Sequence, residues 1–271
     1  MSRAIRRPFF LHSMLAFGFA FLYAPIVLLI IFSFNESRLV TVWSGFSVHW
    51  YGELLHNEQL LQAAKLSLRI AVVNATLAMI LGTLAGVILA RYRRMRGHGL
   101  FAVMIAAPLV MPEVILGLSL LLLFIAMEGI IGWPSGRGES TIVIAHVTFT
   151  MAYVAVVVQA KLAAFDESLE EAAMDLGAKP WTVFFRITLP LIAPALIAGW
   201  LLAFTLSFDD LVITSFVAGP GSSTLPMIVY SSVRLGVSPQ INALATLIVV
   251  AVGVIITTAG WLLYRQDKSA T

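Results

Sequence analysis

The sequence predicts an all-α membrane protein with six transmembrane helices. Three observations support this fold class. Sixty per cent of the 271 residues are apolar and only 11% are charged, whereas an ordinary soluble domain has about 25% charged residues. Six apolar stretches reach the length of about 20 residues that a helix needs to cross a bilayer core. Finally, most Lys and Arg residues gather on one side of these stretches.

The six predicted spans follow from hydropathy and length, with polar segments between them. The first span follows Arg3, Arg6 and Arg7. It is longer than the apolar core of about 7–15 residues of a signal peptide, so we interpret it as a retained helix. No soluble domain separates the spans, and residues 1–271 are predicted to form one transmembrane domain. The spans cover residues 11–34, 66–90, 100–125, 140–163, 192–217 and 241–264.

An even number of spans places both termini on one side, and the basic residues identify that side. Twelve of the 17 Lys and Arg residues lie on the side of the termini and five on the other. This bias predicts that both termini are cytoplasmic. The twelve are Arg3, Arg6, Arg7, Arg91, Arg93, Arg94, Arg96, Lys161, Lys179, Arg186, Arg265 and Lys268; the five are Arg38, Lys65, Arg69, Arg137 and Arg234.

Residues 35–65 form the longest outer segment. Its apolar residues have helical spacing, which predicts a helix that lies on the membrane surface. The alternative is a surface that contacts a periplasmic partner, because an exposed apolar face is typical of such surfaces. The predicted face comprises Phe46, Trp50, Tyr51, Leu54 and Leu55.

Several kinds of site are excluded or disfavoured by composition. The chain has no Cys, which excludes disulfides and cysteine nucleophiles. Its five His residues do not have the spacing of metal ligands, so no metal site is predicted. It has no G-x-x-x-x-G-K-[ST] phosphate loop, and any energy from ATP must come from a partner. Nothing in the sequence indicates nucleic-acid binding.

The cytoplasmic segment 164–190 predicts a short helix with defined ends. Ser168 and Glu171 have the spacing of a capping box. Gly177 suits the left-handed position that ends a helix, and Pro180 can begin a second helix. An apolar stripe is predicted at Leu169, Ala172, Ala173 and Leu176, with charges at its rim from Glu170, Glu171 and Asp175; Trp181, Phe184, Phe185 and Ile187 would anchor the second helix, and Pro190 and Pro194 would interrupt the entry to span five.

Three carboxylates fall at membrane depth, namely Glu113 in span three and the adjacent Asp209 and Asp210 in span five. A charge at the centre of a membrane helix costs about 2.5–3.5 kcal/mol on insertion scales, so each carboxylate needs a partner, a water-filled cavity or a proton. The sequence offers Arg69 as the nearest basic residue by depth. These acids either line a pathway for a cation or pair across helices to fix packing.

Broken helices accompany these acids. Pro108 and Pro112 precede Glu113 and should disrupt the helical hydrogen bonds there, as in transporters whose discontinuous helices line a pathway. Tyr153, Trp200 and Phe208 could present aromatic faces to an ammonium group. The alternative for each of these three rings is ordinary packing or contact with lipid.

Residues 171–190 match the pattern E-A-A-x3-G-x9-I-x-L-P at every fixed position. This pattern resembles the coupling segment of permease subunits in binding-protein-dependent ABC importers. Five further stretches resemble the permeases of polyamine importers, and most of all the putrescine permeases. They are F-S-F-N at 32–35, A-P-L-V-M-P-E-V-I at 107–115, G-W-L-L-A-F-T-L-S-F-D-D-L-V-I at 199–213, T-L-P-M at 224–227 and V-R-L-G-V-S-P-Q-I-N-A-L-A-T at 233–246.

The resemblance implies a type I importer permease in a bacterial inner membrane. A second, homologous permease, two copies of a cytoplasmic ATPase and a periplasmic polyamine-binding protein would be its partners, with lipid around it. ATP and Mg would be bound by the ATPase, and this chain would bind no cofactor. Glu170, Glu171, Ala172, Ala173, Asp175 and Gly177 would form the surface that docks into the ATPase. The family commonly has Asp at the position of Glu113, which leaves the choice between putrescine and spermidine open.

Three other functions are compatible with parts of the sequence. A permease for another small cationic solute would have the same features. A secondary transporter would also bury carboxylates, but it needs no coupling segment. An intramembrane protease would need a serine beside His146, or facing carboxylates on two helices. Neither is evident, since Asp209 and Asp210 point about 100° apart on one helix. We therefore predict a non-catalytic transport subunit.

Overall fold

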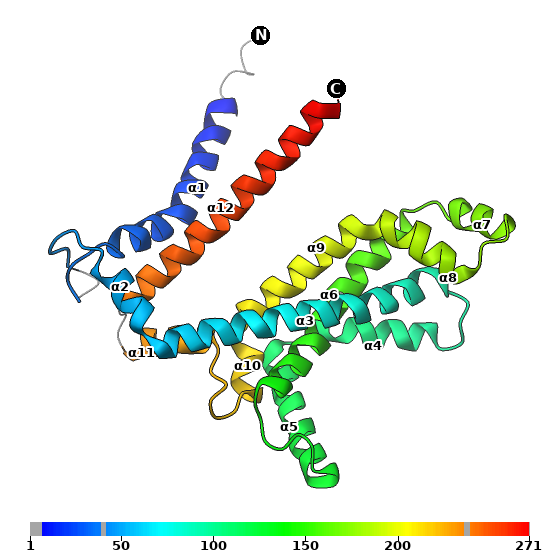
Figure 1. The fold of residues 1–271 in the computed structure, drawn as a ribbon, viewed down its shortest axis with the longest axis horizontal. Coiled ribbons are helices and arrows are strands. Elements are labelled where there is room, and N and C mark those ends of the chain that lie inside the picture. Colours follow the sequence, from blue (N-terminus) through cyan, green and yellow to red (C-terminus); the bar gives the residue numbers. More distant parts are fainter. Residues whose placement is uncertain (1–6, 39–41, 236–238, 271) are drawn as a thin grey trace. The chain divides into compact units, whose positions relative to one another are not determined.

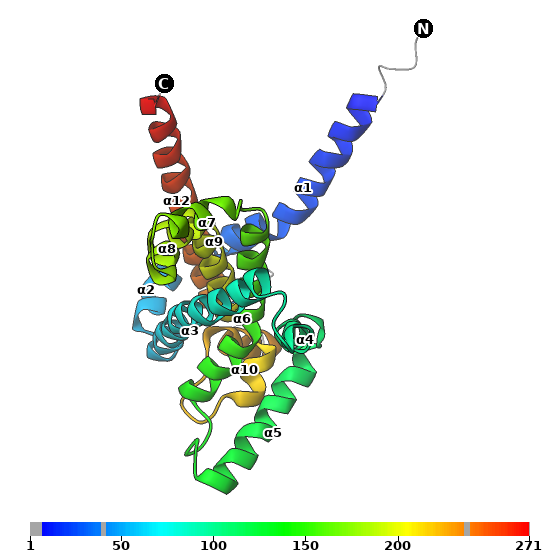
Figure 2. The ribbon, with the colours of Figure 1, turned by 90° about the vertical axis from the view of Figure 1, so that its right-hand side faces the viewer.

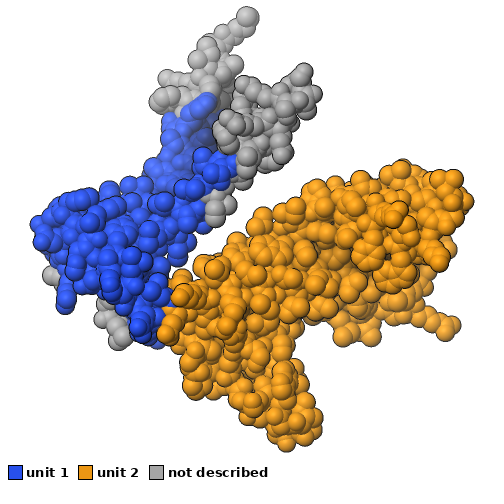
Figure 3. Space-filling model, in the orientation of Figure 1, with its two compact units in different colours: residues 1–61, 229–271 blue, residues 62–228 orange. Residues whose placement is uncertain are grey.

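The computed structural model describes residues 7–38, 42–235 and 239–270, and these residues form helices and connecting turns without a β-strand (Figure 1). Arg3, Arg6 and residues 236–238 lie outside the described residues. The chain divides into two compact units, residues 1–61 with 229–271 and residues 62–228 (Figure 3). The boundaries fall within α3 (Glu58–Arg91) and α11 (Leu225–Leu235).

The first unit contains α1 (Arg7–Phe32), α2 (His49–His56) and α12 (Pro239–Ala270). Both α1 and α2 contact α12, and α1 and α12 separate as they leave α2 (Figure 2). In the apolar stretch Phe10–Phe32, no residue is buried by the described part of the chain. The surface of α1 is therefore left for lipid or for another protein.

Asn35 fixes the turn that follows α1. Its Nδ2 donates to the carbonyl of Val42 at 2.7 Å, and its own carbonyl accepts the indole N–H of Trp50 at 2.7 Å. Of the predicted apolar face, Trp50 and Leu54 are buried within the chain, whereas Leu55 is 67% exposed. Phe46 lies before α2 and is 72% exposed, and contact of this face with the membrane surface or a partner stays a prediction.

The second unit is built around α6 (Glu139–Ala163), whose apolar residues Ile142, Val154, Val158 and Leu162 are fully buried. Around it lie the rest of α3 and, among the described residues, six further helices with a π-helical turn. These are α4 (His98–Val110), α5 (Glu113–Ile131), α7 (Ser168–Asp175), α8 (Pro180–Val183), η1 (Phe184–Thr188), α9 (Leu189–Phe208) and α10 (Val212–Val217).

Small residues bring α3 close to α6. A Cβ atom on Gly82 would lie 2.6 Å from the Val154 Cβ, and one on Gly86 would lie 2.9 Å from the Ala155 carbonyl oxygen. The pair Gly82 and Gly86 has the small-x-x-x-small spacing by which membrane helices pack backbone to backbone.

Five helical segments among the described residues are long and apolar enough to cross a bilayer. They confirm predicted spans one, two and four as continuous helices. The apolar part of α12 within the searched residues, Pro239–Val254, is shorter than a span, so the sixth span stays a prediction. The five are Phe10–Phe32, Glu58–Arg91, Glu113–Ile131, Glu139–Ala163 and Pro180–Phe208.

Span three is interrupted before Glu113, as its prolines predicted, and span five is also divided, at a place where no break was predicted. Residues 100–125 are divided between α4 and α5, because a residue before proline is driven out of helical conformation and Met111 precedes Pro112 with ψ 135°. Pro108 remains inside α4, so only Pro112 breaks the helix. Residues 192–217 are divided between α9 and α10.

The expected interruption at Pro190 and Pro194 is wrong. Pro190 lies in the first turn of α9, where a missing N–H costs little, and Pro194 lies inside the same helix. The widened turn η1 precedes them and is closed by the bond from the Leu189 N–H to the Phe184 carbonyl. The irregularity in the backbone is therefore located before the prolines.

Candidate functional site

The predicted coupling helix is α7, and its N-terminal end differs from the prediction. Ser168 is the first helical residue, so the expected capping box with Glu171 is wrong. Asp166 satisfies an N–H group at the start of the helix instead, since its Oδ1 accepts a hydrogen bond from the Ser168 N–H at 3.0 Å. This bond holds the pKa of Asp166 below its ordinary value, because it stabilises the charged carboxylate.

At the C-terminal end of α7 the prediction for Gly177 is confirmed. Its φ is +88°, the left-handed conformation. The Gly177 N–H donates to Met174 O at 2.9 Å and the Ala178 N–H to Ala173 O at 3.0 Å, which is the hydrogen-bond pattern of a Schellman motif. Pro180 then begins α8 as expected.

No residue of α7 is buried by the rest of the chain. Glu171, Ala172 and Asp175 are exposed, and Ala173 is half-buried. The stripe that begins at Leu169 ends at Leu176, which is 90% exposed. Its apolar side chains are thus available to another protein.

Glu170 is the exception on α7, because its carboxylate turns inward. The Thr188 hydroxyl donates to Glu170 Oε1 at 2.6 Å, and Arg91 Nε lies 3.2 Å from Oε2. The Glu170 side chain is only 16% exposed. It therefore fastens α7 to α3 and η1, and it does not form part of the charged rim that the sequence suggested.

The predicted anchors of the second helix are only partly buried. Phe184 and Ile187 are half-buried, but Trp181 is 73% and Phe185 is 55% exposed. The last two stack on each other with ring centres 6.0 Å apart. The prediction that they pack against the helices of this chain is wrong, and they add to the exposed apolar surface beside α7.

Glu113 is the first residue of α5, directly after the proline break, and it is exposed. Its carboxylate has no hydrogen-bond or ion-pair partner in the described part of the chain. Arg69, the basic residue proposed from its depth for Asp209 or Asp210, pairs with Glu139 instead. That expectation is wrong because Arg69 lies at the level of the first turn of α6.

The two adjacent aspartates have different surroundings. Asp209 ends α9 and is exposed. The side chain of Asp210 is only 6% exposed, and its Oδ2 accepts bonds from the Thr214 N–H at 2.7 Å and the Thr214 hydroxyl at 2.6 Å. With Oδ1 3.3 Å from the Ile213 N–H, Asp210 caps the N-terminal end of α10.

His146 on α6 completes this buried polar cluster. Its Nδ1 lies 2.7 Å from Ser207 Oγ, and its Nε2 lies 3.2 Å from Asp210 Oδ2 and 2.9 Å from Thr214 Oγ1. Sequence reasoning found no serine partner for His146, and this was wrong. The four side chains join α6 to the end of α9 and the start of α10, across the break.

The helices that follow the two breaks, α5 and α10, pack against each other. Gly117 of α5 is so close to α10 that an added Cβ would lie 2.8 Å from the Phe216 ring. The segment after α5 reaches the far end of α10, where Arg137 donates to Phe216 O at 3.2 Å. Glu113 is the first residue of α5, and Asp209 lies in the break between α9 and α10, so both exposed acids lie at a helix break.

The predicted aromatic residues do not form one cage. Tyr153 packs edge-on against Phe149 at 5.2 Å. Trp200 and Phe208 lie on α9 with Phe204 between them, in a stacked ladder with centroid spacings of 5.4 and 5.7 Å. This ladder ends beside Asp209. Sequence reasoning missed Phe204, although its spacing of four residues from both rings was a usable signal.

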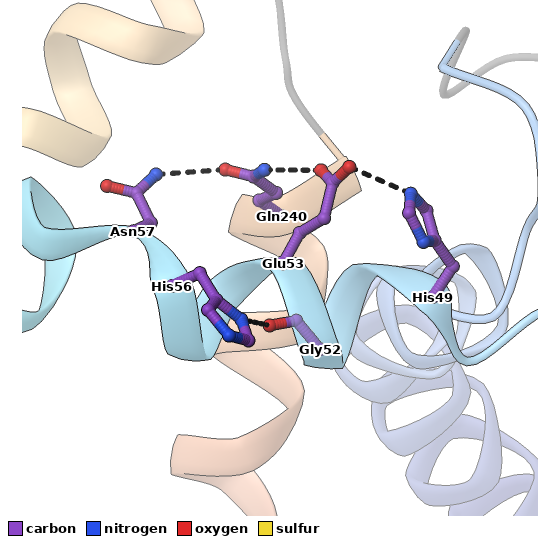
Figure 4. Close-up of a pocket in the computed structure, with 6 residues that line it drawn as sticks. All are labelled: His49, Gly52, Glu53, His56, Asn57 and Gln240. Carbon is purple, nitrogen blue, oxygen red and sulfur yellow. Dashed lines mark hydrogen bonds and ion pairs between the residues drawn. The ribbon is translucent and has the colours of Figure 1, made fainter.

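A polar pocket of about 510 Å³, which was not predicted from the sequence, lies between α2 and the first turn of α12. Gln240 reaches from α12 to α2, donating to Glu53 at 2.8 Å and accepting from Asn57 at 3.0 Å (Figure 4). His49 lies 2.8 Å from the other oxygen of Glu53. These contacts hold the pKa of Glu53 below its ordinary value, with the Gln240 hydrogen bond as the largest cause.

Known proteins resemble this chain over most of its length. Residues 82–271 match the model of the family "Binding-protein-dependent transport system inner membrane component". The putrescine transport system permease protein PotI of Escherichia coli K12 is 62% identical, covering 94% of this chain and 90% of its own length. The spermidine/putrescine transport system permease protein PotC of the same strain is 43% identical, covering 93% and 92%.

Solved structures share the fold at lower identity. A chain of a bacterial ABC transporter involved in the import of alginate superposes with a TM-score of 0.70 at 17% identity, covering 97% of this chain and 98% of its own. A chain of the MetNI methionine ABC transporter in an inward-facing conformation gives a TM-score of 0.62 at 17% identity, covering 76% and 94%. The predicted ABC permease fold is thus confirmed.

Proposed function

Because this chain belongs to the family of inner membrane components of binding-protein-dependent transport systems, we propose that it is the permease subunit of an ATP-driven importer of putrescine, with spermidine as a second possible substrate. Family membership confirms the prediction of a transport subunit that is not an enzyme. The 62% identity to a putrescine permease is the observation that carries the choice of substrate class.

In this proposal the chain is one domain of six spans with cytoplasmic termini. The bias of basic residues supports the orientation. The apolar surface of α1, which the chain itself does not cover, supports a second permease as neighbour. The remaining partners are two copies of an ATPase and a periplasmic polyamine-binding protein.

The coupling surface of the proposal is α7. The exposed Ala172 and the half-buried Ala173, with the exposed charges of Glu171 and Asp175 beside them, form a narrow ridge that fits a groove on an ATPase subunit. Closure of the ATPases on binding ATP would push this ridge and open the spans outward; hydrolysis would reset them inward. ATP and Mg stay on the ATPase, and this chain binds no cofactor.

The cation pathway of the proposal passes the two breaks. The exposed carboxylates of Glu113 and Asp209 lie at these breaks, and fixed negative charges in a restricted passage concentrate cations. The aromatic ladder of Trp200, Phe204 and Phe208 leads to Asp209 and offers ring faces to ammonium groups. Asp210 and Tyr153 support this lining by packing, each held by neighbours within the chain.

The Ser207, His146 and Asp210 cluster does not support the alternative of a protease. Ser207 is 5% exposed, and the Asp210 carboxylate is occupied by the amides at the start of α10.

One experiment distinguishes the proposed polyamine permease from a permease for another small cation. The complete complex is reconstituted in vesicles and ATP-dependent uptake of labelled putrescine, spermidine and lysine is compared. Uptake of lysine without either polyamine would refute the substrate assignment.

A further inference from the structure

The contact that holds α7 to the rest of the chain is a small polar joint. No residue of α7 is buried, and the Glu170 carboxylate makes an ion pair with Arg91 and accepts a hydrogen bond from Thr188. Arg91 contributes Nε at 3.2 Å to Glu170 and Nη1 at 2.6 Å to Glu167. Thr188 donates its hydroxyl to the other Glu170 oxygen at 2.6 Å.

Each partner of Glu170 belongs to the end of a different membrane helix. Arg91 is the last residue of the 34-residue helix α3. Thr188 is the last residue of η1, the π-helical turn that leads directly into α9. A displacement of Glu170 is therefore applied to α3 and α9 together, at their ends nearest to α7 (Figure 1).

The Arg91–Glu170 pair differs from an ordinary surface ion pair, which contributes little to the stability of a protein. The Arg91 side chain is 14% exposed and that of Glu170 is 16% exposed. The Arg91 guanidinium also lies over the Phe165 ring, 5.9 Å from its centre. A shielded pair of this kind resists separation, because breaking it leaves a charge without a partner in a poorly solvated place.

The joint is not tightly filled. A cavity of about 200 Å³ lies beside it, lined in part by Arg91, Glu170, Met174 and Thr188. Arg91 Nε and Nη2 are both buried and make no hydrogen bond to a described residue, so the contact of Nε with Glu170 is an ion pair. Arg91 thus has a free donor and space in which Glu170 can shift while the pair stays intact.

From this geometry we infer that Arg91 is a positioning residue of the transport cycle, through which movement of α7 is transmitted to α3 and α9. The inference rests on the proposed function, since it needs an ATPase that moves α7. In the absence of Arg91, α7 would still present its exposed ridge to the ATPase, but a movement of α7 would displace α3 and α9 less.

The test compares transport with ATP hydrolysis in the reconstituted full complex. Arg91→Gln should keep ATPase activity and assembly while the number of polyamines transported per ATP falls about tenfold, the loss expected from removing a coupling of typical size. Arg93→Gln is the matched control, because Arg93 is an exposed arginine of the same loop, and its ratio should equal that of the wild type.

A charge exchange gives the decisive second measurement. Arg91→Glu and Glu170→Arg should each lower the ratio, and the double variant should recover part of it. An unchanged ratio in Arg91→Gln, or a double variant no better than the single ones, overturns the inference. If Arg91→Gln does not assemble, Glu170→Gln replaces it, because it removes the other charge of the pair, and an unchanged ratio there has the same consequence. Wild-type complex without ATP-driven polyamine uptake would instead refute the proposed function.

Discussion

His146 Nδ1 lies 2.7 Å from the hydroxyl of Ser207, and this contact joins the buried centre of α6 to the last turn of α9. The other ring nitrogen of His146 reaches Asp210. The break between α9 and α10 is therefore held by side-chain hydrogen bonds at the place where the backbone is not helical.

Replacement of each aspartate should separate structure from transport. Asp210→Asn removes charged hydrogen bonds at a buried site, each of which contributes about 1.5–3 kcal/mol, so we expect a clearly lower Tm of the purified protein in detergent. Asp209→Asn changes an exposed carboxylate and should lower polyamine uptake without lowering the Tm. Equal losses of Tm in both variants would contradict this division of roles.

Glu113→Gln should reduce uptake of the cation roughly tenfold, because the passage loses a fixed negative charge that concentrates cations, while the complex still assembles. Glu128→Gln on the same helix is the matched control. Glu128 accepts a bond from the Gly136 N–H, which a glutamine oxygen can also accept, so uptake should be unchanged. Initial rates of uptake at several substrate concentrations check this, and equal rates for wild type and Glu113→Gln would exclude the role.

Gly177→Trp should weaken binding of the ATPase subunit. An added Cβ meets nothing within 4 Å, so the cost comes from the left-handed backbone, about 1–2 kcal/mol, and from the indole placed beside the α7 ridge. Gly97→Trp has the same strain, at φ +85°, and equally open surroundings, but it lies outside α7. Copurification of the ATPase with each variant distinguishes them, and equal recovery would remove the support for docking at α7.

Gly82→Ala should destabilise the protein by about 1–3 kcal/mol, the usual cost of overpacking. The new methyl would lie 2.6 Å from the Val154 Cβ and 2.8 Å from the Met151 carbonyl oxygen, and backbone cannot move aside easily. Gly129→Ala is the control, because its Cβ meets nothing within 4 Å. Thermal unfolding in detergent should show a lower Tm only for Gly82→Ala.

The contact between α2 and α12 should weaken in acid. The pKa of Glu53 is lowered in the folded protein, chiefly by the hydrogen bond from Gln240, with His49 and Arg38 adding to it. Because the folded pKa is depressed, the stabilisation is present above the ordinary Glu value of 4.5 and is lost as pH falls through the lowered value. Gln240→Leu should raise the pH at which hydrogen exchange in residues 49–57 accelerates, after correction for intrinsic rates. The same transition in both proteins would contradict the assigned cause.

Local chemistry determined what could be predicted from the sequence. Gly177 ends α7 and Pro180 begins α8, because both depend on the backbone preferences of a single residue. The break before Glu113 follows in the same way from Pro112. The family pattern located the coupling segment, and comparison with known proteins then confirmed the family.

Contacts between distant segments could not be predicted. Glu170 has the same chemistry as Glu171 in the sequence, and only the positions of Arg91 and Thr188 determine that it turns inward. The serine partner of His146 lies 61 residues away, on a helix whose rotation is set by packing against α6. Asp209 and Asp210 are neighbours in sequence, and only the start of α10 distinguishes their surroundings.

The bare surface of α1 has a consequence for the cell. A newly made copy carries a 23-residue apolar helix in which the described residues of the chain bury no side chain. Copies made in excess of whatever covers that helix would stay incomplete and be open to degradation. The abundance of this protein should therefore follow the supply of its companion rather than its own rate of synthesis.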